Sequence, residues 1–288
     1  MEKQIVVLGT PPRKKIEEFS RAIKASTLFD SNQRQANPNT LIYRGAIDRL
    51  KFHQLAKSLH LDVWIRSIDA KPIQLFVADM EATVIQDEML DILAEERGIG
   101  NEVSQITARA MAGEIDFAQS LIERTRLLAG TPETQLKELC GRIRYMPGAK
   151  ALLTNLRASG VRTVLVTGGY RVFADAVAEA CGFEEVVANA PVLSRGVMTG
   201  ELEHPICDAD TKRAVLLKHC TDLGIDPGAA CCIGDGANDV LMLRACGFPV
   251  SYKGKPIVQE IVDINMTHGD LSTLLLALDA NNTKVEQA

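Results

Sequence analysis

The sequence lacks the features that mark a disulfide-bonded, zinc-thiolate or membrane-spanning protein. Its 288 residues include seven cysteines, an odd number without a Cys-x-x-Cys pair, and five scattered histidines. Neither a disulfide framework nor a histidine or cysteine metal site is therefore expected. No apolar run approaches the roughly 20 residues of a membrane-spanning helix. The first residues, "MEKQIVVLGTPPRKK", carry an acid and too short an apolar run for a signal peptide. These absences predict a cytoplasmic protein with reduced thiols in its core and no membrane partner.

An excess of positive charge is also missing. The chain carries 32 Lys and Arg against 37 Asp and Glu, a formal net charge of −5. This balance argues against nucleic acid or an anionic membrane as a partner. Hydrophobic residues make up 46% and charged residues 24%, proportions that are ordinary for a soluble globular protein with a substantial core. A chain of this length favours one large domain or two medium ones.

The phosphate-binding loops of two common nucleotide-binding classes are absent. No Walker A pattern occurs anywhere in the chain. The segment "GDGAND" does not match the Gly-x-Gly-x-x-Gly loop of dinucleotide-binding folds, because an Asp lies between its glycines where a strand ends. The sequence therefore does not predict a P-loop nucleotidase or a nicotinamide-dependent enzyme.

Residues 1–71 show a short alternation of strand and helix patterns. Three apolar segments have the length of strands, and two amphipathic segments have the length of helices. The pattern predicts a small N-terminal α/β domain that ends at residue 71. The predicted strands are "QIVVLG", "TLIYRG" and "VWIRS", and the predicted helices are "RKKIEEFSRAIK" and "RLKFHQLAKSLH".

A different pattern occupies residues 72–288. The segment "IQLFVAD" is a continuous apolar run of strand length, typical of a strand buried on both faces of a parallel sheet. Only helix patterns follow, at about 86–145, and strands and helices then alternate. This order predicts an α/β fold with a doubly wound parallel sheet, in which a helical block is inserted after the first strand.

Three polar residues mark the predicted starts of helices inside this block. Asn101, Asp116 and Thr131 each precede an amphipathic segment and have side chains that suit an N-cap. Pro132 follows Thr131 at what would be the first helical position, where proline is favoured.

Polar side chains stand at the ends of three predicted strands. Asp79 ends the first strand, Thr167 and two glycines end the second, and Asp235 ends the third with Asp239 close behind. Ligands of such sheets bind beyond the carboxyl ends of the strands. Two carboxylates that face each other there need a cation between them, and oxygen ligands suit Mg²⁺. Taken alone, either Asp79 or Asp235 is equally well explained as a helix cap or a turn former.

Lys212 stands in the first turn of a predicted helix, where the helix dipole disfavours a cation. An unfavourable local placement often has a functional reason. The alternative is a lysine that simply points into solvent. Thr167, Gly168 and Gly169 offer a hydroxyl and free N–H groups at a helix start, which suits a phosphate, although Gly-Gly turns are common.

Taken together, these residues resemble the haloacid dehalogenase-like phosphatases over roughly residues 73–278. The family motifs occur in order as "DMEAT", "LVTGGY", "DADTKRAVLL" and "GDGANDVLML". Within that superfamily the chain is most similar to the members that hydrolyse phosphoserine. The segment "ITARAMAGEIDFAQSLIERTRLLAG" resembles their helical cap, and "GKPIVQE" resembles their core. The resemblance implies a helical cap at about 86–145.

The resemblance also implies a role for each motif residue. Asp79 is the expected nucleophile that forms an aspartyl-phosphate, and Glu81 is expected to protonate the leaving group and to bind Mg²⁺ through its backbone carbonyl. The implied catalytic residues are Asp79, Glu81 and Lys212. The implied metal ligands are Asp79, Glu81, Asp235 and Asp239, with Mg²⁺ as cofactor. The implied substrate ligands are Glu88, Arg124, Thr167, Gly168, Lys212 and Asn238.

Two further apolar residues of the expected cap match positions that pack near the substrate in the family, namely Met111 and Phe117. Ordinary core packing explains each of them at least as well. For Arg124, the pattern of the helix by itself favours a surface residue, and Asp87 is expected to be a solvated charge at a helix start.

Glu81 is the departure from the family pattern, which has Asp at this position. The ordinary pKa values of Asp and Glu differ by only about 0.4, so acidity barely changes. The side chain is longer by one carbon–carbon bond, about 1.5 Å, whereas productive geometry is usually held within about 0.5 Å. The sequence therefore predicts slow but real phosphatase activity.

The leading hypothesis is a Mg²⁺-dependent phosphatase that acts on O-phosphoserine in serine synthesis. One alternative is a phosphatase of another small phosphorylated amino acid, such as phosphohomoserine or phosphothreonine. A second is a catalytically impaired protein that senses an amino acid through residues 1–71. That segment loosely resembles ACT-like extensions, and it suggests serine binding, formation of a homodimer or simple packing on the core.

Overall fold

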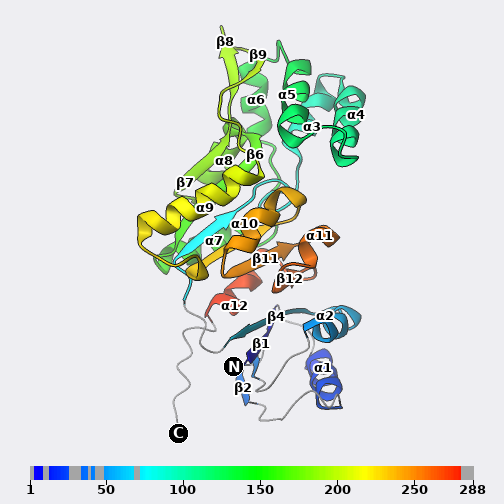
Figure 1. The fold of residues 1–288 in the computed structure, drawn as a ribbon, viewed down its shortest axis with the longest axis vertical. Coiled ribbons are helices and arrows are strands. Elements are labelled where there is room, and N and C mark those ends of the chain that lie inside the picture. The colour runs from blue at the N-terminus through cyan, green and yellow to red at the C-terminus, as the bar shows by residue number, and fades with distance from the viewer. Residues whose placement is uncertain are drawn as a thin grey trace.

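The structure is a computed structural model that describes residues 3–8, 13–25, 34–37, 40–42, 49–67 and 72–279. A ten-stranded sheet runs through it in the order β2-β3-β1-β4-β12-β11-β10-β5-β6-β7 (Figure 1). Its last six strands are mutually parallel, which confirms the predicted parallel sheet. They are β12 (Ile264–Met266), β11 (Phe248–Tyr252), β10 (Ala230–Gly234), β5 (Leu75–Ala78), β6 (Arg162–Tyr170) and β7 (Glu185–Asn189).

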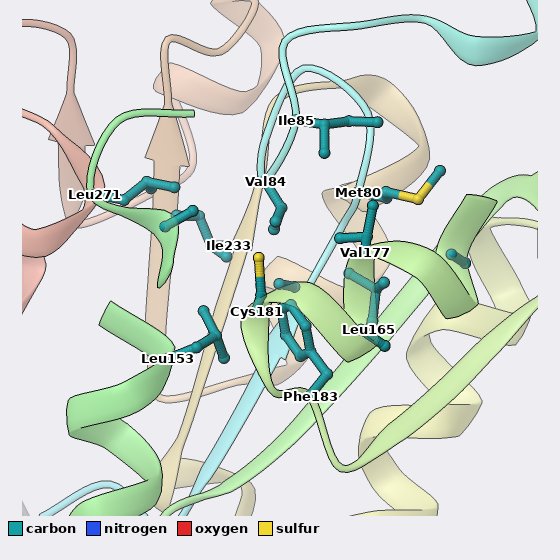
Figure 2. Close-up of a cluster of buried hydrophobic side chains, with 14 of the residues drawn as sticks. Met80, Val84, Ile85, Leu153, Leu165, Val177, Cys181, Phe183, Ile233 and Leu271 are labelled. Atoms are coloured by element: carbon teal, nitrogen blue, oxygen red, sulfur yellow. The ribbon is translucent and has the colours of Figure 1, made fainter. Parts of the chain in front are cut away.

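The strand β5 is buried on both faces, as its apolar run predicts. Successive side chains point to opposite faces, so Leu75 and Val77 join one apolar cluster while Phe76 and Ala78 join another. The larger cluster includes residues of α7 (Ala149–Ala158) and α8 (Arg171–Cys181), and Figure 2 shows part of it. The opposite cluster is formed with α9 (Ala209–Leu223) and α10 (Val240–Ala245). Helices on both faces make this a doubly wound α/β fold.

The N-terminal elements follow the order β-α-β-β-α-β, with sheet order β2-β3-β1-β4, which is the ferredoxin-like arrangement. The assignment of residues 1–71 to a separate, ACT-like domain stays a prediction. Residues 68–71, at the predicted boundary, lie outside the described residues. The elements are β1 (Lys3–Leu8), α1 (Arg13–Ala25), β2 (Arg34–Asn37), β3 (Thr40–Ile42), α2 (Arg49–Ser58) and β4 (Asp62–Ser67).

Strand β4 joins these elements to the rest of the sheet by pairing antiparallel with β12. The short β12 escaped the prediction from sequence, since three residues leave little room for a periodic pattern. The Asp62 carboxylate accepts N–H hydrogen bonds from Thr267 (2.8 Å), His268 (2.9 Å) and Gly269 (2.6 Å), just after β12. Asp62 is buried, so this bonded carboxylate fixes the junction.

Five helices lie between β5 and β6, and Figure 1 shows the first four, which form the inserted block, beyond one end of the core. The predicted N-cap Asp116 is confirmed, since its carboxylate accepts the Gln119 N–H at 2.7 Å. The predicted caps Asn101 and Thr131 are wrong: Asn101 lies inside its helix, and the Thr131 hydroxyl donates instead to the Leu128 carbonyl at 2.7 Å. The inserted helices are α3 (Met89–Glu96), α4 (Gly100–Met111), α5 (Phe117–Leu127) and α6 (Glu133–Cys140).

A hairpin and two short helices complete the described part of the chain. The hairpin follows β7 and forms a separate two-stranded sheet. Among the described helices, none combines the length and the apolarity that crossing a bilayer requires. These remaining elements are β8 (Pro191–Ser194), β9 (Val197–Leu202), α11 (Pro256–Gln259) and α12 (Leu274–Asp279).

Candidate active site

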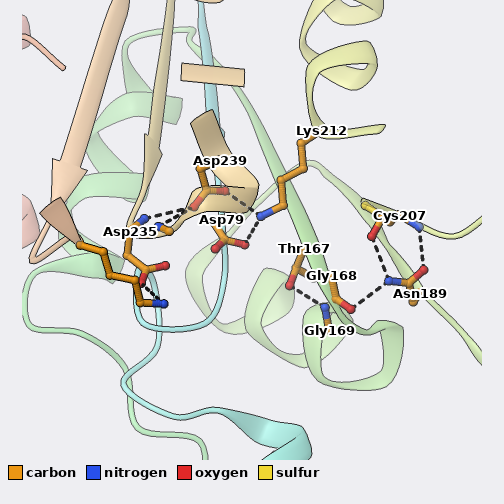
Figure 3. A network of polar contacts seen from close by, with 11 residues as sticks. Asp79, Thr167, Gly168, Gly169, Asn189, Cys207, Lys212, Asp235 and Asp239 are labelled. Atoms are coloured by element: carbon orange, nitrogen blue, oxygen red, sulfur yellow. Dashed lines mark hydrogen bonds and ion pairs between the residues drawn. The ribbon is translucent and has the colours of Figure 1, made fainter. Parts of the chain in front are cut away.

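Three carboxylates meet at the carboxyl ends of two neighbouring strands (Figure 3). Asp79 follows β5, Asp235 follows β10, and the two strands are paired in parallel. Asp239 ends the 3₁₀ turn that comes next in the chain. One oxygen of each carboxylate lies within 4.8 Å of the others. The structure therefore brings Asp79 of the "DMEAT" motif next to Asp235 and Asp239 of the "GDGANDVLML" motif, which is far away in the sequence.

Lys212 extends from α9 into this cluster and is only 1% exposed. Its Nζ donates to Asp79 Oδ1 at 2.6 Å and to Asp239 Oδ1 at 2.8 Å. Burial by itself lowers the pKa of the ammonium, yet the two carboxylates raise it above its ordinary value. The alternative of a solvated lysine is therefore wrong, and the unfavourable helix position is explained by two buried ion pairs.

The backbone of the "GDGAND" segment fixes Asp239. Its second oxygen, Oδ2, accepts the N–H groups of Asp235 (3.2 Å) and Gly236 (3.1 Å). A Cβ at Gly234 would lie 2.4 Å from the Asp239 carboxyl carbon, so the segment needs glycine at that position. The carboxylate is thus held by its own loop and faces Lys212 with Oδ1.

The cluster carries more negative charge than Lys212 can balance. Burial, and then the Asp239 carboxylate, raise the pKa of Asp79 to about 7, although Lys212 lowers it. Burial also raises the pKa of Asp235. Closely spaced carboxylates with raised pKa values have an affinity for added positive charge, and their oxygens are hard ligands. The donor set therefore fits a divalent cation.

The end of β6 lies beside this cluster. Thr167 is buried, and its hydroxyl oxygen accepts the Gly169 N–H at 2.9 Å (Figure 3). A Cβ at Gly168 would lie 2.5 Å from the Phe117 ring of α5, so this aromatic side chain covers the glycine turn. Met111, in contrast, is 77% exposed at the end of α4, so the alternative that its side chain packs in the core is wrong.

Glu81 is directed toward the first turn of α3. Its Oε1 accepts the Met89 N–H at 3.0 Å, and its Oε2 lies 3.0 Å from where a Cβ at Gly169 would stand. Burial, and then the charge of Glu88, raise the pKa of Glu81 to about 8. A carboxyl group with that pKa is protonated at neutral pH and has a proton to donate.

The remaining predicted substrate ligands surround the same region. Glu88 is exposed at the N-cap of α3, and Arg124 is half-buried on α5 with its Nε 3.4 Å from the Ser120 carbonyl oxygen. The Arg124 charge lowers the pKa of both Glu81 and Glu88, which puts it within electrostatic reach of both. Asn238 Oδ1 lies 2.6 Å from the position of a Cβ at Gly236, in the loop that carries Asp235 and Asp239.

Two charged residues differ from what the sequence suggests. Asp87 was expected in solvent, but it is 3% exposed and accepts hydrogen bonds from Arg144 N (2.7 Å) and Nε (2.8 Å). No local pattern signals this contact, because the partners are 57 residues apart. Lys255, which sequence reasoning missed, places Nζ 3.6 Å from Asp235 Oδ2; its segment "GKPIVQE" was the available signal.

Comparison with known proteins gives a family and named relatives. The family profile of haloacid dehalogenase-like hydrolases matches residues 76–244. A phosphoserine phosphatase of Streptococcus thermophilus is 36% identical over 71% of this chain and 95% of its own length. Phosphoserine phosphatase SerB2 of Mycobacterium tuberculosis is 32% identical over 82% of this chain, which spans 58% of that longer relative.

Solved structures of the same kind share the fold. A probable phosphoserine phosphatase from Vibrio cholerae, in its unliganded form, superposes with a TM-score of 0.82 at 27% identity over 96% of this chain and 87% of that one. A substrate-bound phosphoserine phosphatase complex superposes with a TM-score of 0.67 at 30% identity over 72% of this chain and 99% of that one. The first match also covers the N-terminal elements.

Proposed function

The chain belongs to the haloacid dehalogenase-like hydrolases, and we propose that it hydrolyses O-phosphoserine to serine and inorganic phosphate, the last step of serine synthesis. The observation that carries the proposal is the buried Asp79–Lys212–Asp239 cluster at the strand ends. Beside it, Arg124 and Glu88 offer one charge of each sign. A phosphorylated amino acid has groups that complement both.

Asp79 is the nucleophile of this proposal. Its carboxylate attacks phosphorus, the bond to the serine oxygen breaks, and an aspartyl-phosphate forms. Lys212 holds one oxygen of Asp79 at 2.6 Å and supplies positive charge next to the transferring group. Thr167 and the N–H groups of the glycine turn receive the phosphoryl oxygens.

Glu81 provides the proton in the first step and removes one in the second. Protonated at neutral pH, it donates to the oxygen of the departing serine. The resulting carboxylate then takes a proton from water as that water attacks the aspartyl-phosphate. The hydrogen bond from Met89 N–H holds the carboxyl group in one orientation during both steps.

Mg²⁺ is the cofactor we propose for the carboxylate cluster. Asp79, Asp235 and the backbone carbonyl of Glu81 would hold it, and Asp239 would bind its water molecules. When bound, the ion neutralises charge on the transferring phosphoryl group.

Substrate selection is the proposed task of the inserted helices, acting as a cap over the site. Arg124 binds the carboxylate of the substrate through two hydrogen bonds, and Glu88 binds its ammonium group. Phosphohomoserine and phosphothreonine present the same two groups, so a substrate panel has to separate them from phosphoserine. We further propose a cytoplasmic location and a homodimer, with residues 1–71 as the segment that pairs, binds serine or packs on the core.

Removal of the Arg124 side chain tests the proposed substrate class. We expect Arg124→Ala to raise the KM for O-phosphoserine by about 30–100-fold, the size of a lost charge-assisted bidentate contact. Phosphoethanolamine has the ammonium group but no carboxylate, so its KM stays unchanged. The measurement is steady-state release of phosphate from a panel of phosphorylated amino acids in Mg²⁺. Arg126→Ala, an exposed arginine of the same helix, is the matched control. A wild type that releases no phosphate from phosphoserine would refute the proposed function.

Chelation of the metal should expose a pH dependence of stability. In the metal-free protein the pKa of Asp79 is raised from 3.8 to about 7 and that of Glu81 from 4.5 to about 8. The folded state therefore holds protons that the unfolded state releases between about pH 4 and pH 8, and stability falls as pH rises through this window. We expect Tm in a chelator to drop from pH 5 to pH 8.5, and Mg²⁺ to reduce that drop. The same drop with and without Mg²⁺ would argue against a metal at these carboxylates.

A further inference from the structure

A buried hydrogen bond joins the inserted helices to the core sheet directly behind the site. Tyr170 Oη, at the end of β6, lies 2.8 Å from Thr125 Oγ1 in the last turn of α5. Both residues are 0% exposed. They are 45 positions apart in the sequence, so the contact exists only when α5 lies against the end of β6.

The direction of this bond follows from a second contact. The Thr125 hydroxyl donates to the Leu121 carbonyl oxygen at 2.8 Å, one turn earlier in the helix. Its only proton is thereby used, so the Tyr170 O–H donates to Thr125 Oγ1. Burial raises the pKa of Tyr170 to about 12, and the phenol remains a donor at physiological pH.

The placement of this polar pair is unusual. Thr125 stands on α5 between the buried Leu121 and Leu128, where an aliphatic residue would suit the apolar stripe. Tyr170 packs in parallel on the Phe173 ring, with ring centroids 6.4 Å apart. A buried hydroxyl is costly when it lacks a partner, so each of these two constrains where the other lies.

Both residues are neighbours of groups in the proposed site. Thr125 follows Arg124 in α5, and Tyr170 follows the Gly168-Gly169 turn at the end of β6. The charge of Arg124 lowers the pKa of the Tyr170 phenol and that of Glu81 raises it, so the bond lies near both groups. A shift of α5 on β6 therefore moves Arg124 relative to the phosphate-binding turn.

We propose that Tyr170 and Thr125 are positioning residues that fix where α5 lies against β6. They thereby hold the Arg124 guanidinium where it can bind the substrate carboxylate. The inference rests on the proposed function, in which Arg124 binds that carboxylate. It predicts that substitutions in the pair raise the KM for substrates that carry a carboxylate and leave the KM for substrates without one unchanged.

The test compares O-phosphoserine with phosphoethanolamine in full-length variants that contain Mg²⁺. Thr125→Val leaves the Tyr170 O–H buried without an acceptor. We expect it to raise the KM for phosphoserine about five- to tenfold, as one lost buried hydrogen bond allows, with kcat and both constants for phosphoethanolamine unchanged. Thr125→Ser keeps the hydroxyl and should keep the wild-type selectivity. Tyr170→Phe leaves Thr125 bonded to Leu121 and should produce a smaller rise in the KM for phosphoserine. This variant tests the inference if Thr125→Val does not fold.

The double variant Tyr170→Phe with Thr125→Val replaces both partners by apolar groups. We expect it to lose less selectivity than the two single variants added together, because no hydroxyl is left unpaired. Additive losses would overturn the inference, as would an unchanged ratio of the two KM values in both single variants or equal losses on both substrates. A wild type that does not discriminate between the two substrates would instead refute the proposed role of Arg124.

Discussion

Replacement of Asp79 by asparagine is expected to abolish hydrolysis of O-phosphoserine, with a loss of roughly 10⁴-fold or more in kcat, as for other enzymes whose nucleophile is removed. An amide oxygen cannot form the acyl-phosphate that the proposed mechanism requires. Of the two other carboxylates in the described cluster, Asp239 is held by two N–H groups and Lys212, and Asp235 is a proposed metal ligand. The measurement is steady-state phosphate release with a phosphate assay sensitive enough for slow turnover.

The fold should survive this substitution, so that the loss can be assigned to chemistry. The amide still accepts the hydrogen bond from Lys212, and one of the negative charges that repel each other is removed. We therefore expect an equal or higher Tm in a metal-free buffer. Asp210→Asn removes an exposed carboxylate two residues from Lys212 and serves as the control, with activity like the wild type. Retained turnover in Asp79→Asn would exclude Asp79 as the nucleophile.

Glu81 carries the second large effect. Glu81→Gln keeps the length and the acceptor for Met89 N–H but has no proton to donate, so we expect kcat to fall by about 10²–10⁴-fold, the usual contribution of a general acid and base. The aspartyl-phosphate should accumulate in this variant after mixing with substrate, because no base is present to activate water. Quenched-flow measurement of acid-stable phosphoprotein detects it.

Glu81→Asp asks whether the longer side chain is a handicap. The carboxyl group of an aspartate reaches about 1.5 Å less far from the backbone. This difference is larger than the roughly 0.5 Å within which productive geometry is usually held. We expect turnover to rise in Glu81→Asp, since the family motif has aspartate at this position. Equal or lower turnover would show that Glu81, held by Met89 N–H, is already in a productive place.

Much of the fold could be predicted because its signals are local. The apolar run that forms β5 and the helix start at Asp116 depend on patterns within a few residues, and the structure has both where the sequence places them. The helix starts at Asn101 and Thr131 were wrong, because competing backbone and side-chain hydrogen bonds decide a boundary to within a residue or two.

The sequence by itself determined which residues stand at the strand ends. Asp79 and Asp235 follow apolar strands, Thr167 lies near the end of a third, and parallel strands bring their carboxyl ends to one edge of the sheet. Only the tertiary structure decided what surrounds them. It paired Asp87 with Arg144, turned Glu81 toward α3 and buried the Tyr170–Thr125 bond between the inserted helices and the core. Such contacts depend on distances between segments far apart in the chain, and through-space charge and burial, not sequence neighbours, set the protonation of the groups involved.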